Sequence, residues 1–179
     1  EPLIDATSRM GRARISIDAP DGAVTGTVVT GMFLDATILV TEREILVGRS
    51  ARTNAAGIAE LARLVAPWGH TVREVHTPPG VLHFKTDCSL LASDTVLSTT
   101  RLSASGCFDG YRIIDVADGE EAAANTIRFN DLVIMPAGFP RTRDLLAQAG
   151  YKVQEIGNSE CAKLDGGMSC LSLRFTPRA

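Results

Sequence analysis

The chain contains the same succession of strand-like and helix-like segments more than once. Residues 43–75, REILVGRSARTNAAGIAELARLVAPWGHTVREV, are echoed by residues 131–156, DLVIMPAGFPRTRDLLAQAGYKVQEI. Each copy starts with an apolar strand that turns at a glycine, continues into a helix, and leaves through a second glycine into an alternating strand. A looser copy lies between them, where TVLSTT (95–100) and YRIIDV (111–116) flank a Ser/Gly-rich link. The repeated unit is therefore predicted to be strand, turn, helix, strand.

Further strand candidates lie between and around these copies: VTGTVVTG (24–31), LHFK (82–85), SLLA (89–92), NTIRF (125–129) and CLSLRF (170–175). Strand pairs that alternate with helices predict an α/β protein with three modules and a partial one. A period of roughly 40 residues favours small modules around a central axis, because one such module cannot bury its apolar face alone. An ordinary doubly wound sheet is equally compatible with the pattern.

The composition fits one globular domain over residues 1–179, with 45% hydrophobic residues. A net charge of −3 and dispersed Lys and Arg residues give no basic field for nucleic acid. No apolar run approaches the roughly 20 residues that span a bilayer, and residues 1–20 lack the apolar core of a signal peptide. We therefore expect no nucleic-acid or membrane partner and a cytoplasmic location.

Four cysteines are present and none forms a C-x-x-C pair, which argues against a disulfide framework or a zinc ribbon. Cys170 follows a Gly-Gly turn in LDGGMSCLSLRF and opens a predicted strand, where its thiol can face a cleft beside Asp165. A small core residue is the commoner role for such a cysteine. His83, in VLHFKTDCS, also starts a predicted strand, where a structural histidine is the usual case. Together, Cys170 and His83 meet the chemical requirement for a Cys/His nucleophilic pair.

Two other residues are candidates for supporting roles. Asp35, in FLDATILV, precedes a strand and can orient an imidazole, although a turn aspartate is the simpler interpretation. Arg52, in GRSARTNAAG, comes just before a helix that Thr53 or Asn54 can cap. An arginine there can bind a carboxylate in bidentate fashion, or it can be a solvated surface residue. The same segment lacks the P-loop lysine and the Rossmann glycine spacing, which argues against nucleotide ligands.

In order and spacing, several segments resemble the dimethylarginine dimethylaminohydrolases, a family of the arginine-modifying pentein superfamily: VGRSARTNAAG, LHFKTDCS, AANTIRFNDLVIMPAGFPRTRDLL, GYKVQEI and LDGGMSCLSLRF. The resemblance implies an α/β propeller of strand-strand-helix-strand modules with five-fold pseudosymmetry. It also implies that this chain is a partial copy without the N-terminal module or modules. The implied activity is hydrolysis of methylated arginine to citrulline and a methylamine, with no cofactor and no metal.

The resemblance also implies roles for individual residues. Cys170 matches the nucleophile that attacks the guanidinium carbon, and His83 matches the general acid/base. Asp35 matches the acidic residue that completes this catalytic group. Substrate-binding roles fall to three further residues: Arg52, Arg9 and Asp165. The implied partner is a methylated arginine, and a homodimer remains open.

Two alternatives remain open from the sequence. One is an arginine deiminase-like guanidino hydrolase from the same superfamily. The other is a catalytically inactive pentein that binds arginine. The second is motivated by the acidic pair with which the family grips the guanidinium, which falls in the absent N-terminal part, and by the altered turn after Asp35.

Overall fold

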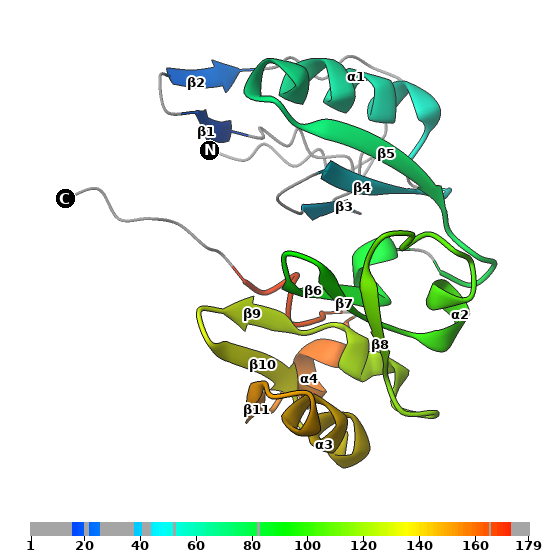
Figure 1. Cartoon of the computed structure of the whole chain (residues 1–179), viewed down its shortest axis with the longest axis vertical. Helices are drawn as coiled ribbons and strands as arrows, with labels where there is room; N and C mark the ends of the chain where they lie inside the picture. Colours follow the sequence, from blue (N-terminus) through cyan, green and yellow to red (C-terminus); the bar gives the residue numbers. More distant parts are fainter. Residues whose placement is uncertain are drawn as a thin grey trace.

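The structure, a computed structural model, describes residues 16–19, 22–25, 38–40, 44–51, 53–81, 83–164 and 166–172. It begins with an antiparallel hairpin of β1 (Ser16–Ala19) and β2 (Gly22–Thr25). Of the predicted strand VTGTVVTG, residues 24–25 belong to β2 and the remainder lies outside the described residues. Three three-stranded sheets follow along the chain (Figure 1).

The three sheets share one topology. The first module contains β3 (Ile38–Val40), β4 (Glu44–Arg49), α1 (Ala55–Val65), the 3-10 helix η1 (Ala66–Trp68) and β5 (Thr71–His76). The second contains the 3-10 helix η2 (Phe84–Thr86), β6 (Cys88–Ala92), β7 (Thr95–Ser98), α2 (Thr100–Ser103) and β8 (Arg112–Asp115). The third contains the 3-10 helix η3 (Glu121–Ala124), β9 (Ile127–Phe129), β10 (Leu132–Pro136), α3 (Pro140–Gln148) and β11 (Lys152–Ile156), and α4 (Ser159–Ala162) follows it.

In every module the first two strands pair antiparallel, and the third strand lies parallel to the second after a helical crossover. The predicted strand-strand-helix-strand unit is thus confirmed in all three copies, including the looser central one. The described strands form separate sheets, so the doubly wound alternative is wrong for this part of the chain. Instead β3 contacts β6 and β6 contacts β9, which brings the first strands of neighbouring modules together. The main helices α1, α2 and α3 lie toward the outside of this arrangement (Figure 1).

Helix α1 shows why these residues form a crossover. The Asn54 side chain caps it by accepting a hydrogen bond from the Gly57 N–H at 2.9 Å. Its inward face follows helical spacing, with Ile58, Leu61 and Val65 buried against the sheet. The helix then passes into η1, after which Gly69 adopts a φ of 79° and returns the chain into β5.

Apolar clusters lie across the module boundaries. The first joins the sheets of modules one and two: Leu46, Val75, Phe84, Cys88, Val96, Leu102, Cys107 and Phe108. The second joins modules two and three: Leu91, Leu97, Val116, Ala123, Ala124, Val133, Met135 and Leu146. Because no described strand pairs with a strand of another module, these side chains supply much of the cohesion between neighbours.

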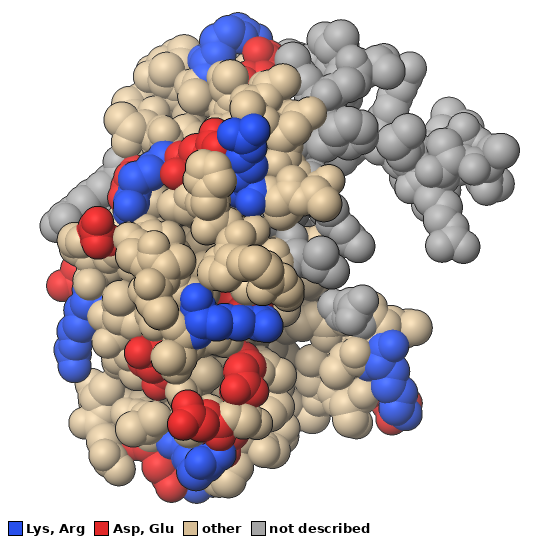
Figure 2. All heavy atoms as spheres, turned by 90° about the vertical axis from the view of Figure 1, so that its right-hand side faces the viewer, with Lys and Arg blue, Asp and Glu red and all other residues tan. Residues whose placement is uncertain are grey.

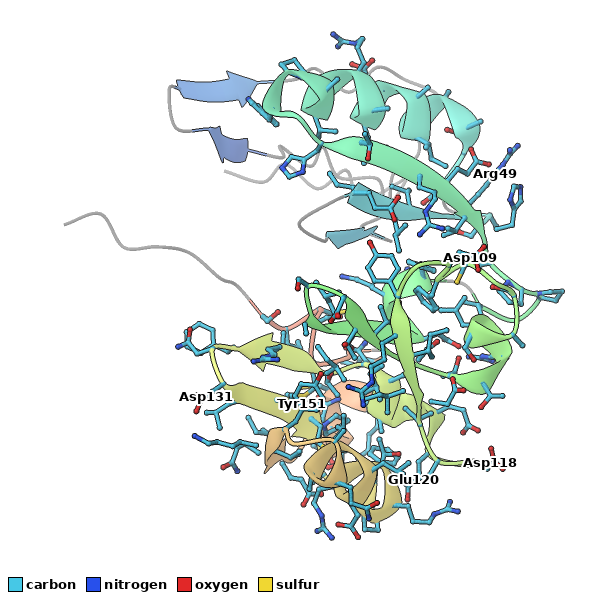
Figure 3. All side chains as sticks on the ribbon, in the orientation of Figure 1. Arg49, Asp109, Asp118, Glu120, Asp131 and Tyr151 are labelled. Carbon is cyan, nitrogen blue, oxygen red and sulfur yellow. The ribbon has the colours of Figure 1, made fainter. Side chains whose placement is uncertain are left out.

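Helix α3 receives its N-terminal cap from the loop that follows the second module. Glu120 is buried, and its carboxylate accepts hydrogen bonds from the backbone N–H of Thr142 at 2.7 Å and of Arg141 at 3.3 Å. Figure 3 shows Glu120 beside this end of the helix. Burial opposes ionisation of Glu120, but the hydrogen bonds from Thr142 and Arg141 outweigh it and lower the pKa of this carboxyl.

We expect Glu120→Ala to lower the free energy of unfolding by about 1–2 kcal/mol at neutral pH, because two helix N–H groups lose their acceptor. The folded-state pKa of Glu120 lies below its ordinary value of 4.5, so the associated stability is present above that pH. It is lost as the pH falls through the folded-state pKa. Urea unfolding of both proteins between pH 7 and pH 3 measures the difference, which should shrink on acidification. A difference that stays constant over this range would contradict the assignment.

Charged side chains of both signs are interspersed on the face shown in Figure 2. On that face the described Lys and Arg side chains form no continuous basic surface. Within the described part of the chain, no helix combines the length and the apolar character needed to cross a bilayer.

Candidate active site

Cys170 lies in a tight turn after α4, with its side chain exposed. The Leu171 N–H donates to the Gly167 carbonyl at 3.2 Å, and the Ser172 N–H donates to the Ser169 carbonyl at 3.4 Å. These bonds coil the backbone over residues 167–172. The predicted strand 170–175 is therefore wrong for residues 170–172, because local turn closure prevails over the alternating apolar pattern, and residues 173–175 lie outside the described part.

The two glycines before Cys170 are needed because protein groups approach them closely. A Cβ on Gly166 would come 2.9 Å from the Cys161 carbonyl oxygen, to which the Gly166 N–H donates. A Cβ on Gly167 would overlap the side-chain amide of Asn125. Both glycines thus permit tight packing of the loop against its supports. The groups that approach this backbone in the structure are parts of the protein itself.

His83 is half-buried and precedes η2. The predicted strand LHFK is wrong for residues 83–85, and residue 82 lies outside the described part. The Thr86 N–H donates to the His83 carbonyl at 3.0 Å, and the Asp87 N–H donates to the Phe84 carbonyl at 3.2 Å, which closes a 3-10 turn. This turn places the fully buried Phe84 ring in the cluster between modules one and two. His83 itself keeps extended backbone angles, with φ −123° and ψ 119°.

The remaining candidate residues lie outside the described part of the chain: Arg9, Asp35, Arg52 and Asp165. Their roles stay predictions, as does the juxtaposition of Cys170 with His83. Both Cys170 and His83 occupy positions outside the strands and α-helices of the modules.

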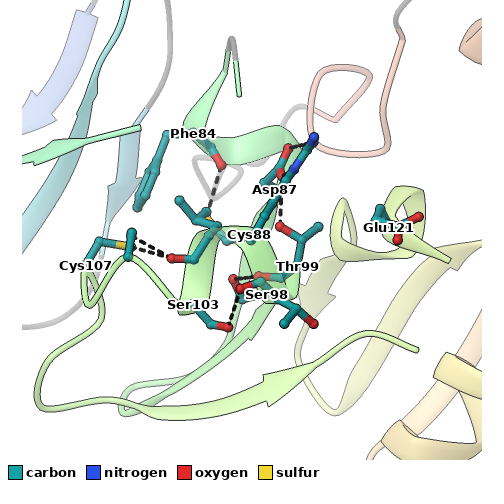
Figure 4. Close-up of polar contacts among 12 residues, drawn as sticks. Phe84, Asp87, Cys88, Ser98, Thr99, Ser103, Cys107 and Glu121 are labelled. Atoms are coloured by element: carbon teal, nitrogen blue, oxygen red, sulfur yellow. Dashed lines mark hydrogen bonds and ion pairs between the residues drawn. The ribbon is translucent and has the colours of Figure 1, made fainter. Parts of the chain in front are cut away.

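Two of the four cysteines are buried and two are exposed, so they differ in how readily their thiols can react. Cys88 is fully enclosed, and burial raises the pKa of its thiol well above the ordinary value. Burial likewise raises the pKa of Cys107. Their sulfur atoms lie near the carbonyl oxygens of Phe84 and Leu102, at 3.3 Å and 3.6 Å (Figure 4). Neither thiol is suited to form a thiolate at neutral pH, which leaves the exposed Cys161 and Cys170 as nucleophile candidates.

The second module contains an ion pair that the sequence did not indicate. The Asp87 side chain is only 3% exposed, and the Arg101 guanidinium binds it through Nε at 2.5 Å and Nη2 at 2.9 Å. The Thr99 hydroxyl donates to the same carboxylate at 2.8 Å (Figure 4). Arg101 also borders a small cavity of about 100 Å³. No spacing rule joins Asp87 to Arg101, so sequence reasoning missed the pair.

Among the described residues, no group of three or more His, Cys, Asp or Glu side chains is arranged to hold a metal ion. Among the candidate residues, the described part of the chain holds the thiol of Cys170 and the imidazole of His83. A thiolate can attack an electrophilic carbon, and an imidazole can transfer protons to and from the groups that leave and enter.

Comparison with known proteins shows what the chain is similar to. No family model matches the chain. A dimethylarginine dimethylaminohydrolase from Pseudomonas aeruginosa is 38% identical over 159 residues, which cover 89% of this chain and 58% of that protein. The solved structure of a variant of the Pseudomonas aeruginosa enzyme complexed with citrulline superposes with a TM-score of 0.77 at 36% identity, covering 83% of this chain and 58% of that chain. The chain resembles the dimethylarginine dimethylaminohydrolases in sequence and in fold.

A second dimethylarginine dimethylaminohydrolase, from Streptomyces coelicolor, is 34% identical over 133 residues, covering 73% of this chain and 50% of that protein. The chain thus spans between half and three-fifths of the length of these two relatives. An amidinotransferase from Microseira wollei has a TM-score of 0.68 at 19% identity, covering 80% of this chain and 46% of that chain, and it shares the fold alone. These likenesses confirm the expected pentein fold for the matched part of the chain.

Proposed function

We propose that the chain carries the reacting residues of a hydrolase that converts methylated arginine to citrulline and a methylamine. The observation that carries the proposal is the 38% identity to the Pseudomonas aeruginosa dimethylarginine dimethylaminohydrolase across 89% of the chain. The chain spans 58% of that relative, so the activity of the whole protein is part of the proposal. Two features support it physically: the exposure of Cys170 and the burial of Cys88 and Cys107.

In the proposed first step, the Cys170 thiolate attacks the guanidinium carbon of the substrate. The new C–S bond forms as the C–N bond to the methylated nitrogen breaks, and protonated His83 gives its proton to the departing amine. In the second step, neutral His83 takes a proton from water while the water oxygen bonds to the same carbon. The C–S bond then breaks, citrulline leaves, and the thiolate is restored.

The other proposed roles follow from the family resemblance. Asp35 would orient the His83 imidazole and stabilise its cationic form. Arg52 and Arg9 would bind the carboxylate of the substrate, because a guanidinium fork matches carboxylate geometry. Asp165 would bind at the amino-acid end of the substrate. The reaction uses protein side chains and water, and the proposal assigns it no cofactor.

We expect Cys170→Ser to lower citrulline formation from asymmetric dimethylarginine by at least about 10³-fold, because a neutral hydroxyl replaces the nucleophile. Cys161→Ser is the matched control, since Cys161 is also exposed and lies in the same stretch of chain. Colorimetric citrulline assays of the purified wild-type protein and both variants provide the measurement. Full activity in Cys170→Ser, or an equal loss in Cys161→Ser, would refute the assigned nucleophile.

An assay with unmethylated arginine distinguishes the proposed activity from an arginine deiminase-like activity. Residues of this chain are 36% identical over 64 positions to a bifunctional arginine dihydrolase/ornithine cyclodeaminase from Synechocystis, covering 36% of this chain and 9% of that protein. Unmethylated arginine should therefore be assayed in parallel. Faster citrulline formation from arginine than from dimethylarginine would favour a deiminase-like activity.

A covalent probe tests the alternative that the protein binds arginine but is catalytically inactive. A solved dimethylarginine dimethylaminohydrolase forms an adduct with 4-chloro-2-hydroxymethylpyridine. If this chain shares that chemistry, mass spectrometry after incubation with the same compound should locate the adduct on Cys170 and leave Cys161 unmodified. Arginine binding without citrulline formation and without this adduct would favour a binding protein.

A further inference from the structure

Asn125 supports the loop that carries Cys170. Its side chain is buried, with the residue 5% exposed, and its Oδ1 accepts a hydrogen bond from the Ser169 N–H at 2.9 Å. Ser169 directly precedes Cys170, and the amide of Asn125 fills the space left by the missing side chain of Gly167. Asn125 therefore constrains the Cys170 turn both by a hydrogen bond and by close packing.

Asn125 is in turn fixed to the second module. The next residue, Thr126, donates its N–H to the Ser89 Oγ at 2.8 Å, and the Ser89 hydroxyl lies within hydrogen-bonding distance of the Ala124 and Thr126 carbonyls. Ser89 lies on β6, the strand that follows η2 and His83. A short path of covalent and hydrogen bonds thus runs from the His83 segment through Ser89, Thr126 and Asn125 to the residue before Cys170.

We propose that Asn125 is a positioning residue, which sets the place of the Cys170 thiol relative to the His83 imidazole. The inference rests on the proposed nucleophilic role of Cys170. Asn125 bonds to the backbone of the loop rather than to reacting atoms, so it acts through Cys170 and is not a catalytic residue. A displacement of about 1 Å between two reacting groups can lower the rate about 10²-fold. We therefore expect the reaction to slow when the hydrogen bond between Asn125 and Ser169 is lost.

The test compares Asn125→Leu, Asn125→Asp and a control, Asn54→Leu. Leucine approximates the branched shape of asparagine without an acceptor, whereas aspartate keeps an oxygen for the Ser169 N–H. Asn54 is a matched control, because its side chain also accepts a backbone N–H at 2.9 Å but caps α1 in the first module. Each protein is assayed for citrulline formation well below its melting temperature.

We expect Asn125→Leu to lower kcat about 10- to 100-fold with KM changed by less than about threefold. Asn125→Asp should recover most of kcat at its own pH optimum, and Asn54→Leu should keep wild-type kcat. A wild-type kcat in Asn125→Leu, or an equal loss in Asn54→Leu, would overturn the inference.

Thiol alkylation tests Asn125 without turnover. The rate of iodoacetamide reaction with Cys170 is followed by peptide mass spectrometry at one fixed pH, with Cys161 in the same chain as reference. We expect the ratio of the Cys170 rate to the Cys161 rate to change at least about threefold in Asn125→Leu and to stay at the wild-type value in Asn54→Leu, because the turn that carries Cys170 loses the hydrogen bond to Ser169 and its packing against Gly167. An unchanged ratio in Asn125→Leu would overturn the inference. Absence of citrulline in the wild-type protein would instead count against the proposed function, and the alkylation rates would still decide the role of Asn125.

Discussion

Arg101→Ala should lower the free energy of unfolding by about 3 kcal/mol, which is the lower end of the cost of breaking a buried ion pair. The variant leaves a buried Asp87 carboxylate without its cationic partner, while the Thr99 hydroxyl still donates a hydrogen bond to it. Arg101 itself is 49% exposed, so its removal uncovers a path for water and moderates the penalty. At about 2–4 °C per kcal/mol for a chain of this size, the melting temperature should fall by about 6–12 °C.

A matched control exists on α1. Arg63 forms a two-bond ion pair with Glu60, but this pair is on the surface. Arg63→Ala should leave the melting temperature unchanged within about 1 °C, because exposed ion pairs contribute little. Differential scanning calorimetry of both variants makes the comparison. An equal shift for Arg101→Ala and Arg63→Ala would show that burial of Asp87 does not govern the stability of this pair.

Gly48→Ala should disturb both stability and the candidate site. A Cβ at Gly48 would lie 2.5 Å from the Phe84 Cβ and 3.1 Å from the Thr77 Cγ2. The Phe84 Cβ is tied to its backbone, so relief requires the 3-10 turn that follows His83 to move. Overpacking of this kind costs about 1–3 kcal/mol. Because the turn carries His83, we also expect kcat for citrulline formation to fall by about tenfold or more.

Gly157→Ala is the control, because it replaces a glycine by alanine at a position where the added Cβ meets no other atom. A Cβ at Gly157 would meet no atom within 4 Å, and Gly157 does not have a positive φ. Thermal melts and citrulline assays of both variants should show an effect for Gly48→Ala alone. Normal activity in a destabilised Gly48→Ala protein would mean that the η2 turn tolerates movement without loss of His83 function.

The module topology could be predicted from the sequence because its signals are local. In KVQEI and TVREV, strand alternation predicts β11 and β5, and the helical spacing of Ile58, Leu61 and Val65 predicts α1. The strand predicted for residues 83–85 is wrong because η2 depends on the burial of Phe84 against Gly48, and these two residues belong to different modules.

The candidate site was predictable in part. Cys170 and His83 stand out through residue type and through motif resemblance. Asn125 does not, because its hydrogen bond reaches a residue 44 positions away and no motif marks it. The Asp87–Arg101 pair, 14 positions apart, also lacks a periodic signature. Contacts of this kind depend on how modules pack, which local sequence patterns do not encode.

The separation of the described strands into independent sheets affects how the protein unfolds. Hydrogen-bond ladders end at each module boundary, whereas the neighbours adhere through side chains such as Phe84 and through the Ser89 link to Thr126. Opening of one module therefore breaks no β-ladder in the next. Unfolding free energies should be distributed in steps along the chain, with each module acting as a cooperative unit coupled to its nearest neighbour.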